Sequence, residues 1–87
     1  MIKGITTTGF AFEVEDEALD NYELLETLTC IDKGDLTVIP EMLDILLGKE
    51  QTAQLKEHVR QQVGRISTKA MMNEVALILG SGNKLKN

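Results

Sequence analysis

Residues 40–51 read PEMLDILLGKEQ and contain an apolar run that a single aspartate interrupts. The leading proline suits the first turn of a helix and Gly48 suits the position after a helix end, which predicts a short helix over residues 40–47. Only Glu41 and Asp44 are polar in this helix, and their spacing puts them on one side. A helix with one narrow polar edge is buried on most of its circumference, so we expect it to be the hub of the core or to contact another protein.

The sequence after Gly48 predicts two more helices. Residues 50–62 carry a thin apolar seam among many glutamine and charged side chains, and Gly64 ends that helix. A serine or threonine can then cap a helix over residues 68–79, which is apolar on more than one face. The last residues, 81–87, are predicted to form a flexible tail.

The sequence before residue 40 begins with a predicted β-hairpin over residues 1–15. Its first half is rich in isoleucine and threonine, Thr8 and Gly9 supply a turn, and apolar side chains then alternate with other residues at the two-residue period of a strand. One face of the hairpin is therefore apolar. Two strands alone are marginally stable in water, so helices must cover that face.

A helix over residues 20–33 is predicted to follow the hairpin. Asp20 and Glu23 have the spacing of a capping arrangement, and Gly34 suits the left-handed conformation past the helix end. We expect the acidic side chains of this helix to face water. Its buried stripe is expected to comprise Tyr22, Leu24, Leu25, Leu28 and Ile31.

These segments predict an α+β, predominantly α fold, in which an N-terminal β-hairpin packs on a bundle of about four short helices. A chain of 87 residues forms one domain, which we place at residues 1–80. Aromatic side chains are few, so the core is expected to be aliphatic. Usual stabilities per residue give a free energy of unfolding of about 4–13 kcal/mol.

The charge is distributed unevenly along the chain, whose formal net charge is -5. Residues 1–50 hold twelve acidic and three basic side chains, whereas residues 51–87 hold two acidic and six basic ones. This asymmetry can serve packing between the halves, head-to-tail association or recognition of a basic partner. The basic residues are dispersed, with no aromatic side chains among them, so nucleic acid is not an expected partner.

The sequence shows no sign of export or membrane insertion. Cys30 is the single cysteine, so an internal disulfide is not expected and nothing indicates an oxidising compartment. The first ten residues lack the apolar segment of a signal peptide, and no run approaches the roughly 20 apolar residues that span a bilayer. We therefore expect a soluble, cytosolic protein without a membrane partner.

Residues that carry catalysis or bind metal are scarce in the sequence. His58 is the single histidine, and its place beside an apolar seam favours a partly buried, hydrogen-bonded structural role. One histidine and one cysteine cannot supply a zinc site, and the acidic residues 13–20 lack the spacing of a calcium loop. Cys30 is expected to be a small buried or half-buried hydrophobic residue. We therefore predict no catalytic residues, no metal and no cofactor.

The apolar surplus of two helices, 40–47 and 68–79, is the strongest functional indication in the residues themselves. Methionine adapts to irregular partners, and an apolar patch left over after the core is filled marks an interaction site. The alternative is that these side chains merely complete the core. The predicted partner-binding residues are Met42, Ile45, Leu46, Met71, Met72, Val75, Ile78 and Leu79.

The order of these features resembles a known family. ITTTGFAFEVEDEALDNYELLETL (residues 5–28) and IPEMLDILLGKEQTAQLKEHVRQQVGRIS (residues 39–67), followed by an apolar helix, are similar to the small tail assembly chaperones of long-tailed phages and prophages of Gram-positive bacteria. The likeness covers nearly the whole chain. It lies in patterns of fold and order rather than in catalytic signatures.

The resemblance implies a non-enzymatic role. Proteins of that family accompany the long tape-measure protein while tail-tube subunits polymerise around it, and they are absent from the finished virion. The implied partners are the tape-measure protein, the tail tube protein and a frameshifted long form of the chain itself, all in the bacterial host cytoplasm. The rival expectation is a small adaptor or regulatory helical domain that forms a homo-oligomer through the same helices.

Overall fold

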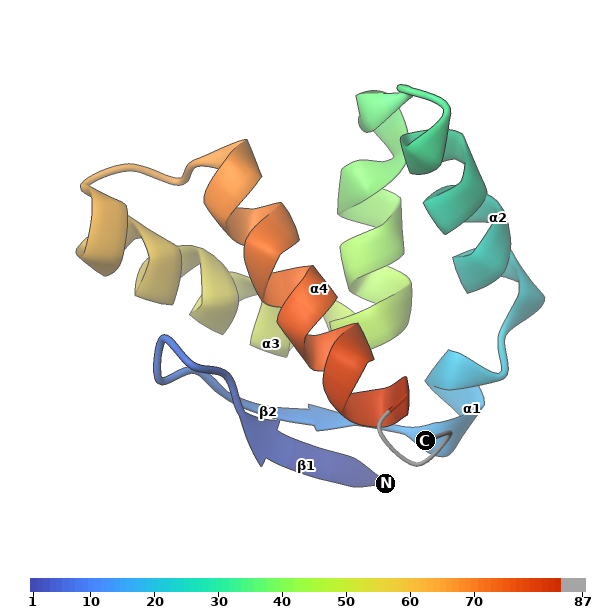
Figure 1. Cartoon of the computed structure of the whole chain (residues 1–87), viewed down its shortest axis with the longest axis horizontal. Helices are drawn as coiled ribbons and strands as arrows, with labels where there is room; N and C mark the ends of the chain where they lie inside the picture. The colour runs from blue at the N-terminus through green and yellow to red at the C-terminus, as the bar shows by residue number, and fades with distance from the viewer. Residues whose placement is uncertain (84–87) are drawn as a thin grey trace.

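The computed structural model describes residues 1–83 and shows an N-terminal hairpin lying across one end of a group of helices (Figure 1). This arrangement confirms the predicted α+β, predominantly α fold. The elements are β1 (Ile2–Ile5), β2 (Ala11–Val14), α1 (Asp16–Leu19), α2 (Tyr22–Asp32), the 3-10 helix η1 (Leu36–Val38), α3 (Ile39–Val63) and α4 (Thr68–Asn83).

The hairpin pairs β1 with β2 in antiparallel register, with Ile2 opposite Val14. Gly9 in the connecting turn has a φ of 99°, a conformation that glycine adopts without steric cost. The side chains of Phe10, Phe12 and Val14 are buried against the helices. The predicted apolar face of the hairpin therefore exists and is covered as the sequence requires.

Gly4 lies opposite Phe12 in the hairpin and leaves room for its ring. A Cβ atom at residue 4 would lie 2.9 Å from Cζ of Phe12, a core side chain with only 2% of its surface exposed. Gly4→Ala is therefore expected to lower the free energy of unfolding by about 1–3 kcal/mol, because a packed ring must move. Urea unfolding measures the loss. Lys3→Ala, at an exposed position of the same strand, is the control, and an equal effect of both changes would contradict the prediction.

A side chain of α3 closes the outer edge of β2. Gln51 Oε1 accepts a hydrogen bond from the Glu13 backbone N–H at 2.8 Å, and Gln51 Nε2 donates to the Glu13 carbonyl oxygen at 2.7 Å. The amide thereby pairs with two backbone groups that a further strand would otherwise bind. These two bonds anchor the hairpin on α3.

The second helix starts two residues after the predicted residue 20, and its N-cap lies one residue later than predicted. Asp20 is the C-cap of the short helix α1, so it cannot also open α2. Asn21 takes that role, because its side chain accepts a hydrogen bond from the Glu23 backbone N–H at 2.8 Å. The prediction that Asp20 caps the longer helix is wrong for this reason.

The predicted buried stripe of α2 is wrong at two positions. Tyr22 is 69% exposed and Leu25 is 56% exposed, because both lie on the side of the helix that faces away from the core. The buried and half-buried side chains of α2 follow the three- and four-residue spacing of one helix face. They are Leu24, Thr27, Leu28 and Ile31.

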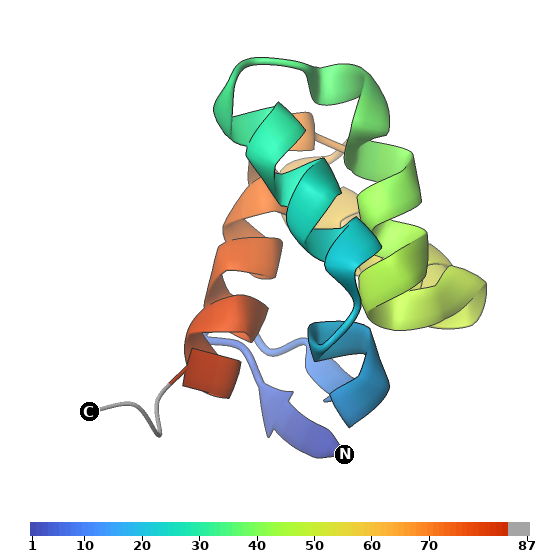
Figure 2. The same ribbon diagram turned by 90° about the vertical axis from the view of Figure 1, so that its right-hand side faces the viewer.

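Helix α3 consists of the two helices predicted at residues 40–47 and 50–62, which meet at Gly48 in a sharp bend. Gly48, at the bend, has a φ of 79° and a ψ of 166°, which are not helical values. The two halves therefore leave the bend in different directions (Figure 1). Helix α2 lies alongside the first half (Figure 2).

The core lies where the hairpin, both halves of α3 and helix α4 meet. Met42 in the first half of α3 and Leu55 in the second half are fully buried, each with 0% of its surface exposed. The helix over residues 40–47 is thus the hub of the core, one of the two roles its sequence allowed. The other buried hydrophobic residues are Phe10, Phe12, Val14, Leu24, Ile39, Leu43, Leu46, Leu47, Val59, Met71, Val75 and Ile78.

Helix α4 begins at Thr68 as predicted but is longer than predicted. It continues through Gly80 to Asn83, so the expected end at residue 79 and the expected tail are wrong for residues 81–83. A glycine inside a helix costs only about 1 kcal/mol relative to alanine, which the helix tolerates. The rest of the predicted tail, residues 84–87, lies outside the described residues. No helix formed by residues 1–83 is long and apolar enough to cross a membrane.

Candidate functional site

The structure places most of the predicted partner-binding residues inside the core. Five of them, Met42, Leu46, Met71, Val75 and Ile78, are buried against the hairpin and against each other. Four of them offer no surface to a partner in this conformation, whereas Met71, although only 4% exposed, also lines a groove described below. The other three, Ile45, Met72 and Leu79, are half-buried and pack against the core.

Exposed apolar side chains lie elsewhere on the molecule. The large ones with at least about half of their surface exposed are Met1, Ile5, Tyr22, Leu25, Leu36 and Ile66. Single exposed apolar residues are normal on protein surfaces, so their number does not indicate a binding site. An exposed apolar residue that lines a concave site is more informative. Ile66, which is 50% exposed, lines such a site.

A groove of about 450 Å³ lies at the bend of α3, and we define it by the residues that line it. Its volume falls in the range of about 300–1,000 Å³ that is usual for binding sites. Most of its lining surface is apolar. The lining residues are Ile39, Pro40, Leu43, Asp44, Lys49, Thr52, Ala53, Lys56, Ile66, Thr68 and Met71.

Four stretches of the chain build this groove. The first half of α3 supplies one wall with Ile39 and Leu43, and the second half supplies another with Ala53. Ile66, in the link between α3 and α4, and Met71 on α4 complete it. Met71 is therefore both a core residue and part of the groove lining.

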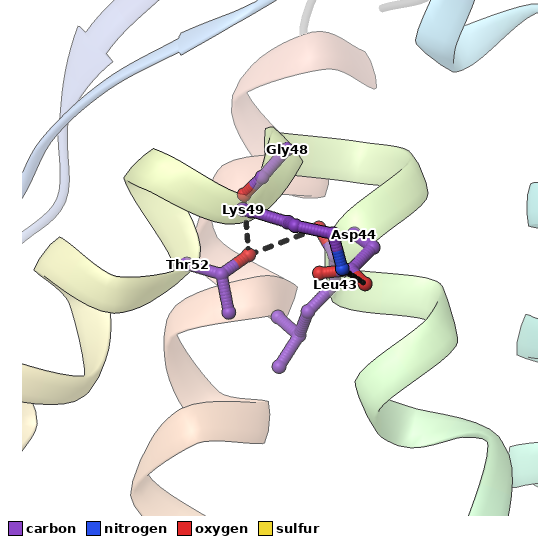
Figure 3. Close-up of polar contacts among 5 residues, drawn as sticks. All are labelled: Leu43, Asp44, Gly48, Lys49 and Thr52. Atoms are coloured by element: carbon purple, nitrogen blue, oxygen red, sulfur yellow. Dashed lines mark hydrogen bonds and ion pairs between the residues drawn. The ribbon is translucent and has the colours of Figure 1, made fainter.

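The bend that opens the groove is held by Thr52 (Figure 3). Thr52 Oγ1 lies 2.7 Å from the Gly48 carbonyl oxygen and 3.2 Å from the Leu43 carbonyl oxygen. A helix leaves its last carbonyl groups without partners, and this hydroxyl partners groups on both sides of the bend. Lys49 Nζ lies 3.2 Å from Asp44 Oδ2 and forms an ion pair across the same bend (Figure 3). The groove is consequently a defined feature of the backbone.

A second hollow, of about 620 Å³, lies between the hairpin and α3 but is a weaker candidate. It is more open than the groove, and nearly half of its lining surface is polar. Gln51 and Glu13 line it and already bond each other. The groove at the bend is smaller yet more enclosed and more apolar, so it is the better site for an apolar ligand.

A buried carboxylate forms the main polar network of the protein. Glu74 on α4 is only 3% exposed, and its oxygens accept hydrogen bonds from Thr6 Oγ1 at 2.8 Å and Thr8 Oγ1 at 2.6 Å. Thr6 Oγ1 also accepts a bond from the Phe10 backbone N–H at 3.1 Å. The network ties the hairpin turn to α4, since burying a charge requires such partners.

His58 joins the same network from α3. Its Nε2 lies 3.0 Å from Thr8 Oγ1, and the centroid of its ring lies 5.5 Å from the centroid of the Phe10 ring. Because the Thr8 hydroxyl proton points to Glu74, Thr8 accepts rather than donates toward His58. A histidine in this geometry is not placed to take the proton of Thr8, so the arrangement does not activate a nucleophile. The half-buried, hydrogen-bonded role expected for His58 is the one the structure shows.

Other ionisable residues show no convergent chemistry. Hydrogen bonds from the Arg60 guanidinium, and then from Gln61, hold the pKa of Glu57 below its usual range on the exposed side of α3. Within the part of the chain that the structure describes, no three histidine, cysteine or acidic side chains gather where a metal ion could bind. Cys30 is a half-buried free thiol, in the setting expected of it.

Comparison with known protein families, with curated proteins and with solved structures finds no match to this chain. The groove therefore has to be interpreted from its own residues. Sequence reasoning did not find it, because its lining comes from residues on both sides of Gly48 and from the link before α4. Gly48 correctly indicated where the first helical half ends, but it did not indicate the direction that the second half takes.

Proposed function

We propose that the protein is a non-enzymatic phage tail assembly chaperone that binds an apolar helical client, the tape-measure protein, through the groove at the bend of α3. The observation that carries the proposal is the groove itself, whose apolar wall includes Ile66, a side chain that the packing of residues 1–80 leaves 50% exposed. A groove of this kind accepts an apolar side chain of an amphipathic helix. The ordered family resemblance supplies the identity of the client.

The role is consistent with the surface of the chain. A long client helix with apolar stripes aggregates unless it is covered, and the net charge of -5 on this small protein favours solubility of a coated complex. In this proposal the chaperone acts in the bacterial host cytoplasm and leaves before the virion is complete. Contacts with the tail tube protein and with a frameshifted long form belong to the same proposal.

Filling the groove is expected to abolish this role without unfolding the protein. Ala53 lines the groove and is exposed, so Ala53→Trp places a large ring in the groove and leaves the core untouched. Gln61→Trp, at another exposed position of α3, adds the same ring outside the groove and is the matched control. The measurement is the soluble fraction of a co-expressed tape-measure protein, with circular dichroism confirming that both variants fold.

The unmodified chain and Gln61→Trp should raise the soluble fraction of the client, and Ala53→Trp should not. If all three proteins solubilised the client equally, the groove would not be the binding site. If the unmodified chain did not raise the soluble fraction of the client, the chaperone role would be contradicted. The rival, a self-associating adaptor, predicts instead a stable homo-oligomer in analytical ultracentrifugation that Ala53→Trp dissociates.

A further inference from the structure

The rim of the groove is more basic than the chain as a whole. Two lysines, Lys49 and Lys56, line it against one acidic residue, Asp44, whereas the whole chain carries a net charge of -5. Both lysines belong to the second half of α3 and both are exposed. The Lys49 side chain is 90% exposed although it pairs with Asp44, so the pair is a surface contact that a ligand can replace.

The two lysines lie on either side of Thr52 and Ala53 in the sequence of the groove wall. They are seven residues apart in a helix, which puts them on one face and about 10 Å apart along the axis. Thr52 and Ala53, the small residues between them, also line the groove. Because these two side chains are small, a second helix can approach α3 closely between the lysines. One lysine then lies near each end of the contact between the two helices.

We propose that the groove recognises an acidic segment of the client: a helix that inserts one apolar side chain between the lysines and places a carboxylate about one turn away on each side. The apolar anchor fills the space beside Ala53 and Ile66, and the carboxylates pair with Lys49 and Lys56. This inference rests on the proposed function and names the chemistry of its binding site.

The charge on the rest of the chain also favours binding of an acidic segment at the groove. Residues 1–50 are strongly acidic, so an acidic client is repelled from most of the chaperone and attracted to the groove. Among the described residues Lys56 forms no ion pair, while Arg60, one turn further along, is already paired with Glu57. Lys56 is consequently the cation at the rim that is free to bind a carboxylate.

Two synthetic helical peptides of about 20 residues test the proposal, because that length supports helix formation when alanine-rich. Both carry one central leucine; one has glutamate four residues before it and three residues after it, and the other has lysine at those positions. Binding to the full chain is measured by fluorescence anisotropy at low and high salt. The charge-reversal variant is Lys49→Glu with Lys56→Glu. Its matched control, Lys3→Glu with Lys33→Glu, makes the same change of charge at exposed positions outside the groove.

The acidic peptide should bind the unmodified chain about tenfold or more tightly than the basic peptide, and raising the salt concentration should reduce that ratio. The groove variant should lose or invert the preference, and the control should keep it. Equal binding of both peptides, binding of neither, or loss of preference in the control as well would overturn the proposal. If the peptides bind equally while Ala53→Trp still abolishes client solubilisation, the charge preference fails and the proposed function stands.

Discussion

Met42→Ala is expected to lower the free energy of unfolding by about 2–5 kcal/mol. Met42 has 0% of its surface exposed and lies at the centre of the core, so truncation removes buried apolar surface and leaves a cavity. The free energy of unfolding of the whole protein is expected to be only about 4–13 kcal/mol, so the variant loses a large part of its stability. Urea unfolding followed by circular dichroism measures the change.

Met72→Ala is the matched control, because it makes the same chemical change at a half-buried position of α4. Its effect should be clearly smaller, since less apolar surface and less cavity are involved. If Met42→Ala instead kept full stability and weakened client binding, residue 42 would belong to an interface, as the sequence alone allowed.

Glu74→Met is expected to lower the free energy of unfolding by about 3 kcal/mol. The two threonine hydroxyls lose a charged acceptor, and a hydrogen bond to a charged group contributes about 1.5–3 kcal/mol. The lower desolvation cost of methionine offsets part of this loss. Of the two hydroxyls, that of the buried Thr6 is the one that water cannot easily reach.

The triple variant Thr6→Val, Thr8→Val, Glu74→Met separates the hydrogen bonds from the packing. Replacing both partners of a buried polar contact with apolar groups of similar shape can be nearly neutral, so this variant should recover at least about half of the loss. Urea unfolding of the single, double and triple variants gives the free energies for a mutant cycle, which measures the coupling between these residues. A triple variant no more stable than Glu74→Met would show that the carboxylate does not act through the two hydroxyls.

Local sequence signals predicted the elements of this protein well where neighbouring residues decide them. The two-residue alternation at Phe10, Phe12 and Val14 identified the buried face of the hairpin. The composition of residues 40–47 indicated a mostly buried helix but left open whether the core or a partner covers it. The N-cap of α2 was missed by one residue, because Asp20 is the C-cap of α1. A side chain does cap the start of α2, but it belongs to Asn21 instead of Asp20.

The site was less predictable than the fold. An apolar side chain on a helix can serve the core or a partner, and the pattern of residues does not distinguish the two, as the burial of Val75 and Ile78 shows. The Glu74 network joins residues 66 and 68 positions apart in sequence, which no local spacing indicates. Both features depend on which surfaces the folded chain brings together.

By itself the sequence determined the hairpin, the helical segments and the aliphatic character of the core, because periodicity, turn residues and composition act over a few neighbouring residues. Only the tertiary structure decided which apolar residues the core consumes and which remain exposed. It also decided the direction in which the second helical half leaves Gly48, and with it the groove that has Lys49 and Lys56 at its rim. Burial depends on contacts between distant segments, and those contacts exist only after the chain has folded.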